Sequence, residues 1–189
     1  MLSVLAGTTR PMTGREVARL LGRRSHSGVL DVLNRLAEQG VVDREEAGRA
    51  FLFTLNREHL AAPAVELLAN LRSELLERLR STIGSWDIAP VHVSLFGSAA
   101  RGEGDASSDI DLFIVRPMKV ESEDTRWREQ LDLLARQVQR WTGNRAGIAE
   151  VGKEAISRLR KERPPILDEL RADAITLAGV EATTLLGEA

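Results

Sequence analysis

The stretch VSLFGSAARGEGDASSDIDLFIV, residues 93–115, places polar side chains at two points of an otherwise apolar strand pattern. Its apolar ends predict two buried strands. Between those ends stand Gly97-Ser98 and, further on, Asp109 and Asp111. Because the side chains of a strand alternate between its two faces, residues 109 and 111 project from the same face. The stretch therefore predicts two carboxylates held side by side, with a Gly-Ser turn before them.

Two neighbouring carboxylates repel each other unless a cation lies between them. Hard oxygen ligands of this kind suit Mg²⁺. Upstream, Gly97 lets the backbone approach a ligand closely, and Ser98 adds a hydroxyl group. A strand, a tight turn and the start of a helix together form a phosphate-binding arrangement. We therefore expect a site that holds a triphosphate together with Mg²⁺.

The same residues resemble the signature of a known superfamily. Gly97-Ser98, ten intervening residues and then Asp109-Ile110-Asp111 are similar to the motif of nucleotidyltransferases related to DNA polymerase β, and most similar to the small, minimal members. The resemblance extends over about residues 89–179. It implies a mixed sheet with helices on one side. It also implies transfer of a nucleoside monophosphate from a nucleoside triphosphate to a hydroxyl group, with release of pyrophosphate.

The resemblance also implies roles for individual residues. Ser98 and nearby backbone N–H groups would hold the β- and γ-phosphates, and Asp109 and Asp111 would ligate Mg²⁺. For Arg101 two roles stay open: it contacts phosphate, or it pairs with Asp109 and keeps the turn rigid.

Family members usually carry a third carboxylate on a neighbouring strand, which corresponds here to RAGIAEV, residues 145–151. Our alignment places Gly147 where that acid belongs. Glu150 is the only acid in this strand, and a shift of one residue reverses the face of a strand side chain. Glu150 is therefore either a catalytic ligand or a solvated charge. Nucleotide binding is predicted more firmly than catalysis, because it requires only the first two acids.

The first 56 residues show a second pattern. MTGREVARLLG, residues 12–22, predicts a helix that begins with a capping box of Thr13 and Glu16. A second helix is expected over residues 28–40, followed by a hairpin around the polar run REEAG. This order resembles the winged helix-turn-helix domain of MarR- and ArsR-type repressors, which implies double-stranded DNA as a partner.

In such domains the second helix of the motif enters the major groove and the wing touches the DNA backbone. Arginine and serine suit phosphate contacts, and asparagine suits adenine. The candidate DNA-binding residues are Arg23, Arg24, Ser25, His26, Ser27, Asn34, Arg35, Arg44 and Arg49. Acidic residues on the same helix and on the wing leave a second interpretation open, in which this domain contacts protein.

Residues 57–86 contain leucines at helical spacing, from Leu60 to Leu79, and predict one long helix that joins two domains. The leucine stripe either packs against both domains or forms the seam of a homodimer. The expected fold class is α+β. It comprises a winged helix-turn-helix domain over residues 1–56, a linking helix over 57–86, and a nucleotidyltransferase domain with a mixed sheet flanked by helices over 87–189.

The composition of the chain excludes several functional classes. The chain has 189 residues, a formal net charge of −2 and no cysteine, which excludes disulfides, iron–sulfur clusters and thiolate zinc sites. Its three histidines lie far apart in sequence. No apolar run is long enough for a membrane span, and the first residues do not have the pattern of a signal peptide. We therefore expect a soluble cytoplasmic protein that does not act at a membrane.

Two functions remain open. The first is an Mg²⁺-dependent nucleotidyltransferase whose acceptor is a protein hydroxyl, as in antitoxin-like members that act on a toxin-like partner, or a nucleic-acid end or a small molecule. The second is a DNA-binding regulator whose nucleotidyltransferase domain binds nucleotide without turning it over.

Overall fold

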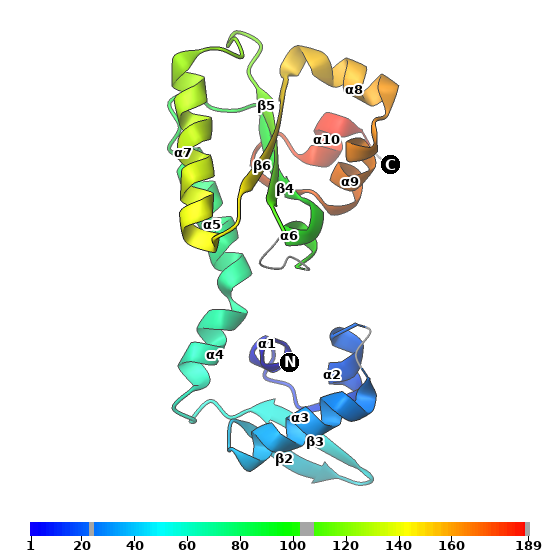
Figure 1. The fold of residues 1–189 in the computed structure, drawn as a ribbon. Helices are drawn as coiled ribbons and strands as arrows, with labels where there is room; N and C mark the ends of the chain where they lie inside the picture. The colour runs from blue at the N-terminus through cyan, green and yellow to red at the C-terminus, as the bar shows by residue number, and fades with distance from the viewer. Residues whose placement is uncertain (23–24, 103–107, 188–189) are drawn as a thin grey trace. The chain divides into compact units, whose positions relative to one another are not determined.

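The computed structural model describes residues 1–22, 25–102 and 108–187 (Figure 1). The chain divides into two compact units, Met1–Glu74 and Leu75–Ala189. Each unit has its own apolar core and is described separately below.

The first unit consists of short helices and a small antiparallel sheet. Its elements in chain order are α1 (Leu2–Ala6), β1 (Met12–Thr13), α2 (Gly14–Leu20), α3 (His26–Glu38), β2 (Val42–Ala47), β3 (Ala50–Leu55) and α4 (Ala62–Ala69). The strand order is β1-β3-β2. The predicted hairpin is present, since β2 and β3 pair antiparallel from Val42 opposite Leu55 to Ala47 opposite Ala50. Its turn lies later than predicted, because residues 44–47 of the polar run REEAG belong to β2 and the chain reverses at Gly48 and Arg49.

The predicted capping box is also present, but it lies at a later helix start. The Thr13 hydroxyl accepts from the N–H of Glu16, and the Glu16 carboxylate accepts from the N–H of Thr13. Helix α2 begins at Gly14 rather than at Met12 because Met12 and Thr13 are extended and pair with β3. The core beneath these elements is built around Leu5, Leu33 and Phe53.

The single long helix that we expected over residues 57–86 is interrupted. Helix α4 ends at Ala69, Asn70 leaves the helical conformation, and α5 spans Leu71–Gly84. The leucine stripe divides one turn later, between Leu71 and Leu75. Leu60, Leu67 and Leu71 are 97%, 72% and 59% exposed. Leu79, in contrast, is fully buried in the core of the second unit.

The second unit is built on a four-stranded mixed sheet. After α5 come β4 (His92–Phe96), α6 (Gly97–Arg101), β5 (Ile110–Arg116), α7 (Thr125–Thr142), β6 (Ala146–Gly152), a 3₁₀ turn (Lys153–Ala155), α8 (Ile156–Glu162), α9 (Pro165–Asp173), β7 (Ile175–Gly179) and α10 (Ala182–Leu186). The strand order is β6-β5-β4-β7, with β5 and β6 parallel and the other pairs antiparallel. A mixed α+β fold is therefore confirmed.

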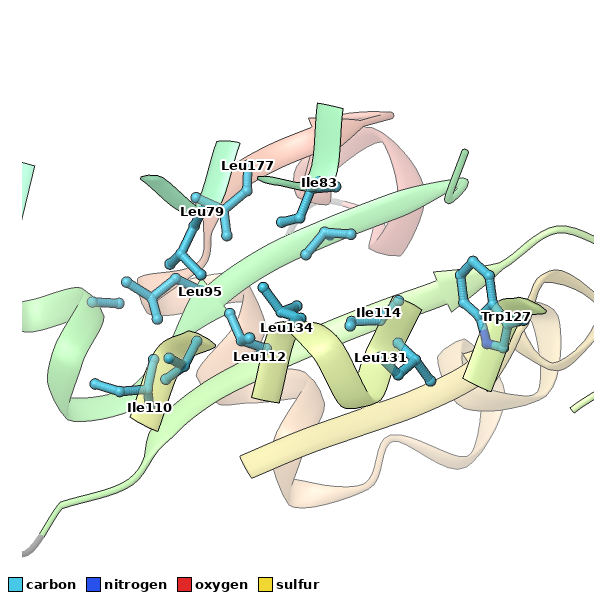
Figure 2. Close-up of a cluster of buried hydrophobic side chains, with 13 residues drawn as sticks. Leu79, Ile83, Leu95, Ile110, Leu112, Ile114, Trp127, Leu131, Leu134 and Leu177 are labelled. Atoms are coloured by element: carbon cyan, nitrogen blue, oxygen red, sulfur yellow. The ribbon is translucent and has the colours of Figure 1, made fainter. Parts of the chain in front are cut away.

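Helices cover both faces of this sheet, which corrects the expectation of helices on one side (Figure 1). Leu112 and Ile114 of β5 pack with α5 and α7, where Trp127 and Leu134 are buried (Figure 2). Phe113 and Val115 point the other way and pack against Leu167 and Leu170 of α9. The strand is apolar on both faces, so each face needs its own cover.

Among the described residues, no helix is both long enough and apolar enough to cross a membrane.

Candidate active site

The two predicted acids lie at the start of the central strand β5. Asp111 is the second residue of β5, and Asp109 lies immediately before the first residue of that strand. Both lie beside the same backbone position of β6: a Cβ atom placed on Gly147 would be 2.8 Å from Oδ1 of Asp111 and 3.8 Å from Cβ of Asp109. Asp109 is exposed and Asp111 is half-buried. Neither carboxylate has a hydrogen bond or ion pair with a described residue.

The Asp111 carboxylate lies between two glycines. A Cβ atom on Gly97 would be 2.7 Å from Oδ2, just as one on Gly147 would crowd Oδ1. Gly97 also has φ = +69°, a conformation that glycine adopts without strain. In the sheet, Asp111 is opposite Phe96 of β4 and Gly147 of β6. A side chain at either glycine would displace this carboxylate.

Asp111 is also held at an electrostatic cost. Burial raises its pKa above the ordinary value, and the negative charges of Asp109 and Glu169 raise it further. All three effects disfavour the ionised form. A cation bound beside Asp109 and Asp111 would offset them.

The Gly-Ser turn forms the junction of β4 and α6. Helix α6 begins at Gly97, and no side chain caps its first turn. Ser98 is half-buried, and its hydroxyl makes no hydrogen bond with a described residue. Arg101, at the other end of α6, forms an ion pair with Asp173 of α9, with Nη1 and Oδ2 2.5 Å apart. Asp173 is a partner of Arg101 that the sequence does not predict.

The structure does not bring Glu150 to the aspartate pair. Glu150 is three residues beyond Gly147 in β6, and an odd separation places its side chain on the opposite face. There its Oε1 accepts from Nε of Arg116 at 2.8 Å and from Nε1 of Trp127 at 2.9 Å. Glu150 is therefore a paired structural charge facing α7, which corrects both of our interpretations.

The residues fit one hydrated divalent ion better than a site with three protein carboxylates. Asp109 and Asp111 present adjacent carboxylate oxygens without a counter-charge in the described chain, and triphosphate oxygens would supply further ligands. Across the described ranges, no group of three or more His, Asp or Glu side chains is placed to hold a metal ion.

The candidate DNA-binding residues have different surroundings in the structure. Arg23 and Arg24 lie outside the described residues. The Ser25 and Ser27 hydroxyls are 2.9 Å apart at the start of α3, and Arg35 is exposed in its last turn. Oδ1 of Asn34 accepts from Nη1 of Arg44 at 3.2 Å, which links α3 to β2.

Two of the candidate DNA-binding residues, His26 and Arg49, line a pocket of about 620 Å³ in the first unit. The pocket brings together His26 and Arg49, both predicted, with Arg15 of α2, which sequence reasoning missed. None of these three side chains pairs with a described residue. The remaining lining residues are Thr13, Gly14, Leu30, Ala47, Ala50 and Phe51. No short motif marks Arg15, because it comes from a different helix.

A family model described as "Nucleotidyltransferase domain" matches residues 72–175, more than half of the chain. The chain therefore belongs to the nucleotidyltransferase family and is an enzyme of that class. The match contains the complete Gly97–Asp111 motif and the strand with Gly147. No curated protein sequence matches the chain.

Three solved structures are similar to this chain over about three fifths of its length. One is the toxin–antitoxin pair MntA–HpeT in mutant form, 14% identical, covering 61% of this chain and 80% of that chain, with a TM-score of 0.38. Another is a toxin–antitoxin with AMP-PNP, 16% identical, covering 61% and 80%, with a TM-score of 0.36. A third is a nucleotidyltransferase described as putative, from Sulfolobus solfataricus, 18% identical, covering 60% and 84%, with a TM-score of 0.31.

Proposed function

We propose that this nucleotidyltransferase transfers a nucleoside monophosphate from an Mg²⁺-bound nucleoside triphosphate to a hydroxyl acceptor. The observation that supports this most is the pair Asp109 and Asp111 at the start of β5, beside the Gly97-Ser98 turn: two neighbouring carboxylates without a counter-charge among the described residues. A pair of this kind is unfavourable unless a cation binds.

Each group has a physical role in this proposal. Asp109 and Asp111 would hold Mg²⁺, which neutralises triphosphate charge and aligns the α-phosphate when it is bound. The Ser98 hydroxyl donates to a phosphate oxygen, and Gly97 leaves room for the phosphates to approach the backbone. Arg101 acts through Asp173, because their ion pair holds α6 against α9 and so fixes the turn.

The transfer is tested by incubating the full chain with each of the four nucleoside triphosphates labelled at the α-phosphate, together with candidate protein, nucleic-acid and small-molecule acceptors. We expect label to move to one acceptor class and pyrophosphate to appear in equal amount, and EDTA to abolish both. A matched control is Asp132→Asn, which removes an exposed acid of α7 far along the chain from the motif. Transfer that persists in EDTA would contradict the proposal.

The acceptor remains open among a protein hydroxyl on a toxin-like partner, a nucleic-acid end and a small molecule. The labelled screen separates these classes directly.

A second candidate is a nucleotide-sensing regulator that binds double-stranded DNA through the first unit, as a winged helix. Gly147 favours it, since no acid stands opposite Asp111. The group of Arg15, His26 and Arg49 around one pocket favours it as well, because the Arg15 and Arg49 guanidinium groups, unpaired among the described residues, suit DNA phosphates. The exposed leucines of α4 would allow a homodimer.

The regulator is tested by duplex binding over a range of salt concentrations. Phosphate contacts release counterions, so affinity should fall steeply as salt rises. Arg15→Gln and Arg49→Gln should each weaken binding and reduce the salt slope by about one, whereas Arg136→Gln in the second unit should have no effect. Duplex affinity that does not change with salt would contradict DNA binding. Mg²⁺-dependent nucleotide binding without any transfer of label would favour the sensor over the transferase.

A further inference from the structure

The Asp111 carboxylate divides the site into two sides. Its Oδ2 faces Gly97 in the turn between β4 and α6, and its Oδ1 faces Gly147 of β6. In the proposed function the triphosphate lies on the side of the Gly97-Ser98 turn. Because the attacking and leaving oxygens of a phosphoryl transfer lie roughly in line, the acceptor hydroxyl then approaches from the side of β6. Strand β6 is the last strand of the four-stranded sheet, so no further strand covers this side.

The turn between α7 and β6 is fixed to the chain that carries the aspartate pair. Nδ2 of Asn144 donates to the carbonyl of Ser108 at 2.5 Å, and Ser108 immediately precedes Asp109. The N–H of Ile110 donates to the carbonyl of Arg145 at 2.8 Å. Hydrogen-bonded neighbouring strands lie about 4.8 Å apart. The backbone of Arg145 is therefore held beside Asp109, on the side from which the acceptor approaches.

The Arg145 side chain is available to a ligand on this side. Arg145 is two residues before Gly147, so the two-residue period of a strand places both on the sheet face that carries Asp109 and Asp111. Arg145 is exposed, and its guanidinium makes no hydrogen bond or ion pair with a described residue, including the two aspartates.

The end of α7 extends the positive surface beyond Arg145. Arg140 is exposed in the last turn of α7, and its side chain is also unpaired among the described residues. Arg78 of α5 lies over the ring of Trp141, 5.8 Å from the ring centroid. Residues 139–149 contain no acid. The end of α7 and the start of β6 lie at the same end of the sheet as α6 (Figure 1).

These charges fit an acceptor that carries phosphates next to its hydroxyl group. Guanidinium groups bind phosphate oxygens through charge-assisted hydrogen bonds. A free carboxylate on this side would repel such an acceptor, but Glu150, the acid of β6, faces α7 and is paired with Arg116 and Trp127.

We propose that the acceptor is the hydroxyl end of a polynucleotide, whose phosphates bind Arg145 and Arg140 along the edge strand β6. This inference rests on the proposed function and narrows its acceptor to one class. In the reaction, the terminal hydroxyl oxygen bonds to the α-phosphorus of the nucleoside triphosphate and the bond between the α-phosphorus and the bridging oxygen breaks. Pyrophosphate leaves, the hydroxyl proton passes to water, and the polynucleotide becomes one nucleotide longer.

The test measures transfer by the full-length protein with Mg²⁺ and nucleoside triphosphates labelled at the α-phosphate. The acceptors are a short single-stranded RNA and a short single-stranded DNA, each with a free 3′-hydroxyl. We expect extension of at least one of them. Arg140→Gln and Arg145→Gln should each raise the KM for the oligonucleotide about tenfold and reduce its salt slope by about 0.7. The KM for the triphosphate should not change.

The matched control is Arg128→Gln, an exposed and unpaired arginine in the first half of α7. It should keep the wild-type KM for both substrates. If Arg140→Gln and Arg145→Gln match this control, or if they raise the KM for the triphosphate instead, the two arginines do not bind the acceptor and the inference is overturned.

The remaining outcomes separate the inference from the proposed function. If label moves to a protein or a small molecule and to neither oligonucleotide, the polynucleotide acceptor is refuted and the proposed function stands. If label moves to no acceptor of any class, both fail.

Discussion

Acidic side chains at the two ends of the parallel strand pair β5–β6 have opposite environments. At one end, Asp109 and Asp111 have no described partner, and burial and like charge raise the pKa of Asp111. At the other end, Glu150 is satisfied by Arg116 and Trp127. A carboxylate with ion-pair and hydrogen-bond partners stabilises the folded state. Two neighbouring carboxylates without partners destabilise it unless a ligand binds. The difference distinguishes a structural carboxylate from a functional one on the same two strands.

The largest effect is expected from Asp111→Asn at the unpaired end. Affinity for Mg²⁺-bound nucleoside triphosphate should fall about 100-fold, because the ion loses a charged ligand. The melting temperature in EDTA should not fall, since burial already disfavours the ionised side chain. Calorimetry and thermal unfolding of the same sample measure both quantities. An Asp111→Asn variant that unfolds at lower temperature and still binds nucleotide would show that Asp111 is a structural carboxylate, as Glu150 is.

Glu150→Gln changes the paired end and should have the opposite pattern. The Arg116 and Glu150 side chains are only 11% and 18% exposed, so the loss of one partner leaves a poorly solvated guanidinium. We expect a loss of about 2 kcal/mol in the free energy of unfolding, measured by urea denaturation, with nucleotide affinity unchanged. Lost nucleotide binding in a fully stable variant would restore Glu150 as a ligand.

Gly147→Ala tests whether the site depends on the glycine opposite Asp111. The added methyl group would meet Oδ1 of Asp111 at 2.8 Å and push the carboxylate aside. We predict about tenfold weaker binding of Mg²⁺-bound nucleotide, measured by calorimetry. The control is Gly84→Ala, since a Cβ at Gly84 meets no atom within 4 Å. Equal affinities of the two variants would show that Asp111 has room to move.

His92 extends the comparison to a buried group that is neutral. Its Nδ1–H donates to the carbonyl of Val180 at 2.6 Å, and Nε2 accepts from the Ser94 hydroxyl at 2.9 Å. Burial lowers the pKa of His92 below its ordinary 6.5. The unfolded chain therefore binds a proton below about pH 6.5 that the folded chain does not, and stability falls as pH drops through that value.

The effect of His92 is the smallest of the four. The free energy of unfolding should fall by on the order of 1 kcal/mol between pH 7.5 and 5.5, measured by urea denaturation at each pH. In His92→Gln this part of the pH dependence should be missing. The same pH dependence in the wild type and in His92→Gln would show that another titratable group causes it.

The aspartate pair could be predicted from the sequence because a two-residue period fixes the face of a strand side chain. The same period, counted from Gly147, places Glu150 on the other face, but its partners Arg116 and Trp127 are distant in sequence and unmarked by any motif. Arg15 was missed for the same reason, since it meets the pocket of the first unit through tertiary packing. The continuous apolar run Leu112–Val115 is the pattern of a strand buried on both faces, whereas the family resemblance implied helices on one side.

The break at Asn70 was also beyond the sequence pattern. Leucine spacing continues across it, so the apolar stripe predicts one helix. The two halves belong to different cores: Val65 packs in the first unit, and Leu79 and Ile83 pack in the second. Periodicity within one segment does not reveal which core each half joins.

The most direct measurement is a calorimetric titration of ATP, GTP, CTP and UTP, each with Mg²⁺, into the wild-type protein and into the double variant Asp109→Asn, Asp111→Asn. The unpaired carboxylates predict a binding isotherm for at least one nucleotide in the wild type, its disappearance in EDTA, and no isotherm in the double variant. Equal heats in the two proteins, or none in the wild type with any nucleotide, would contradict the assignment of these two acids to a metal–triphosphate site.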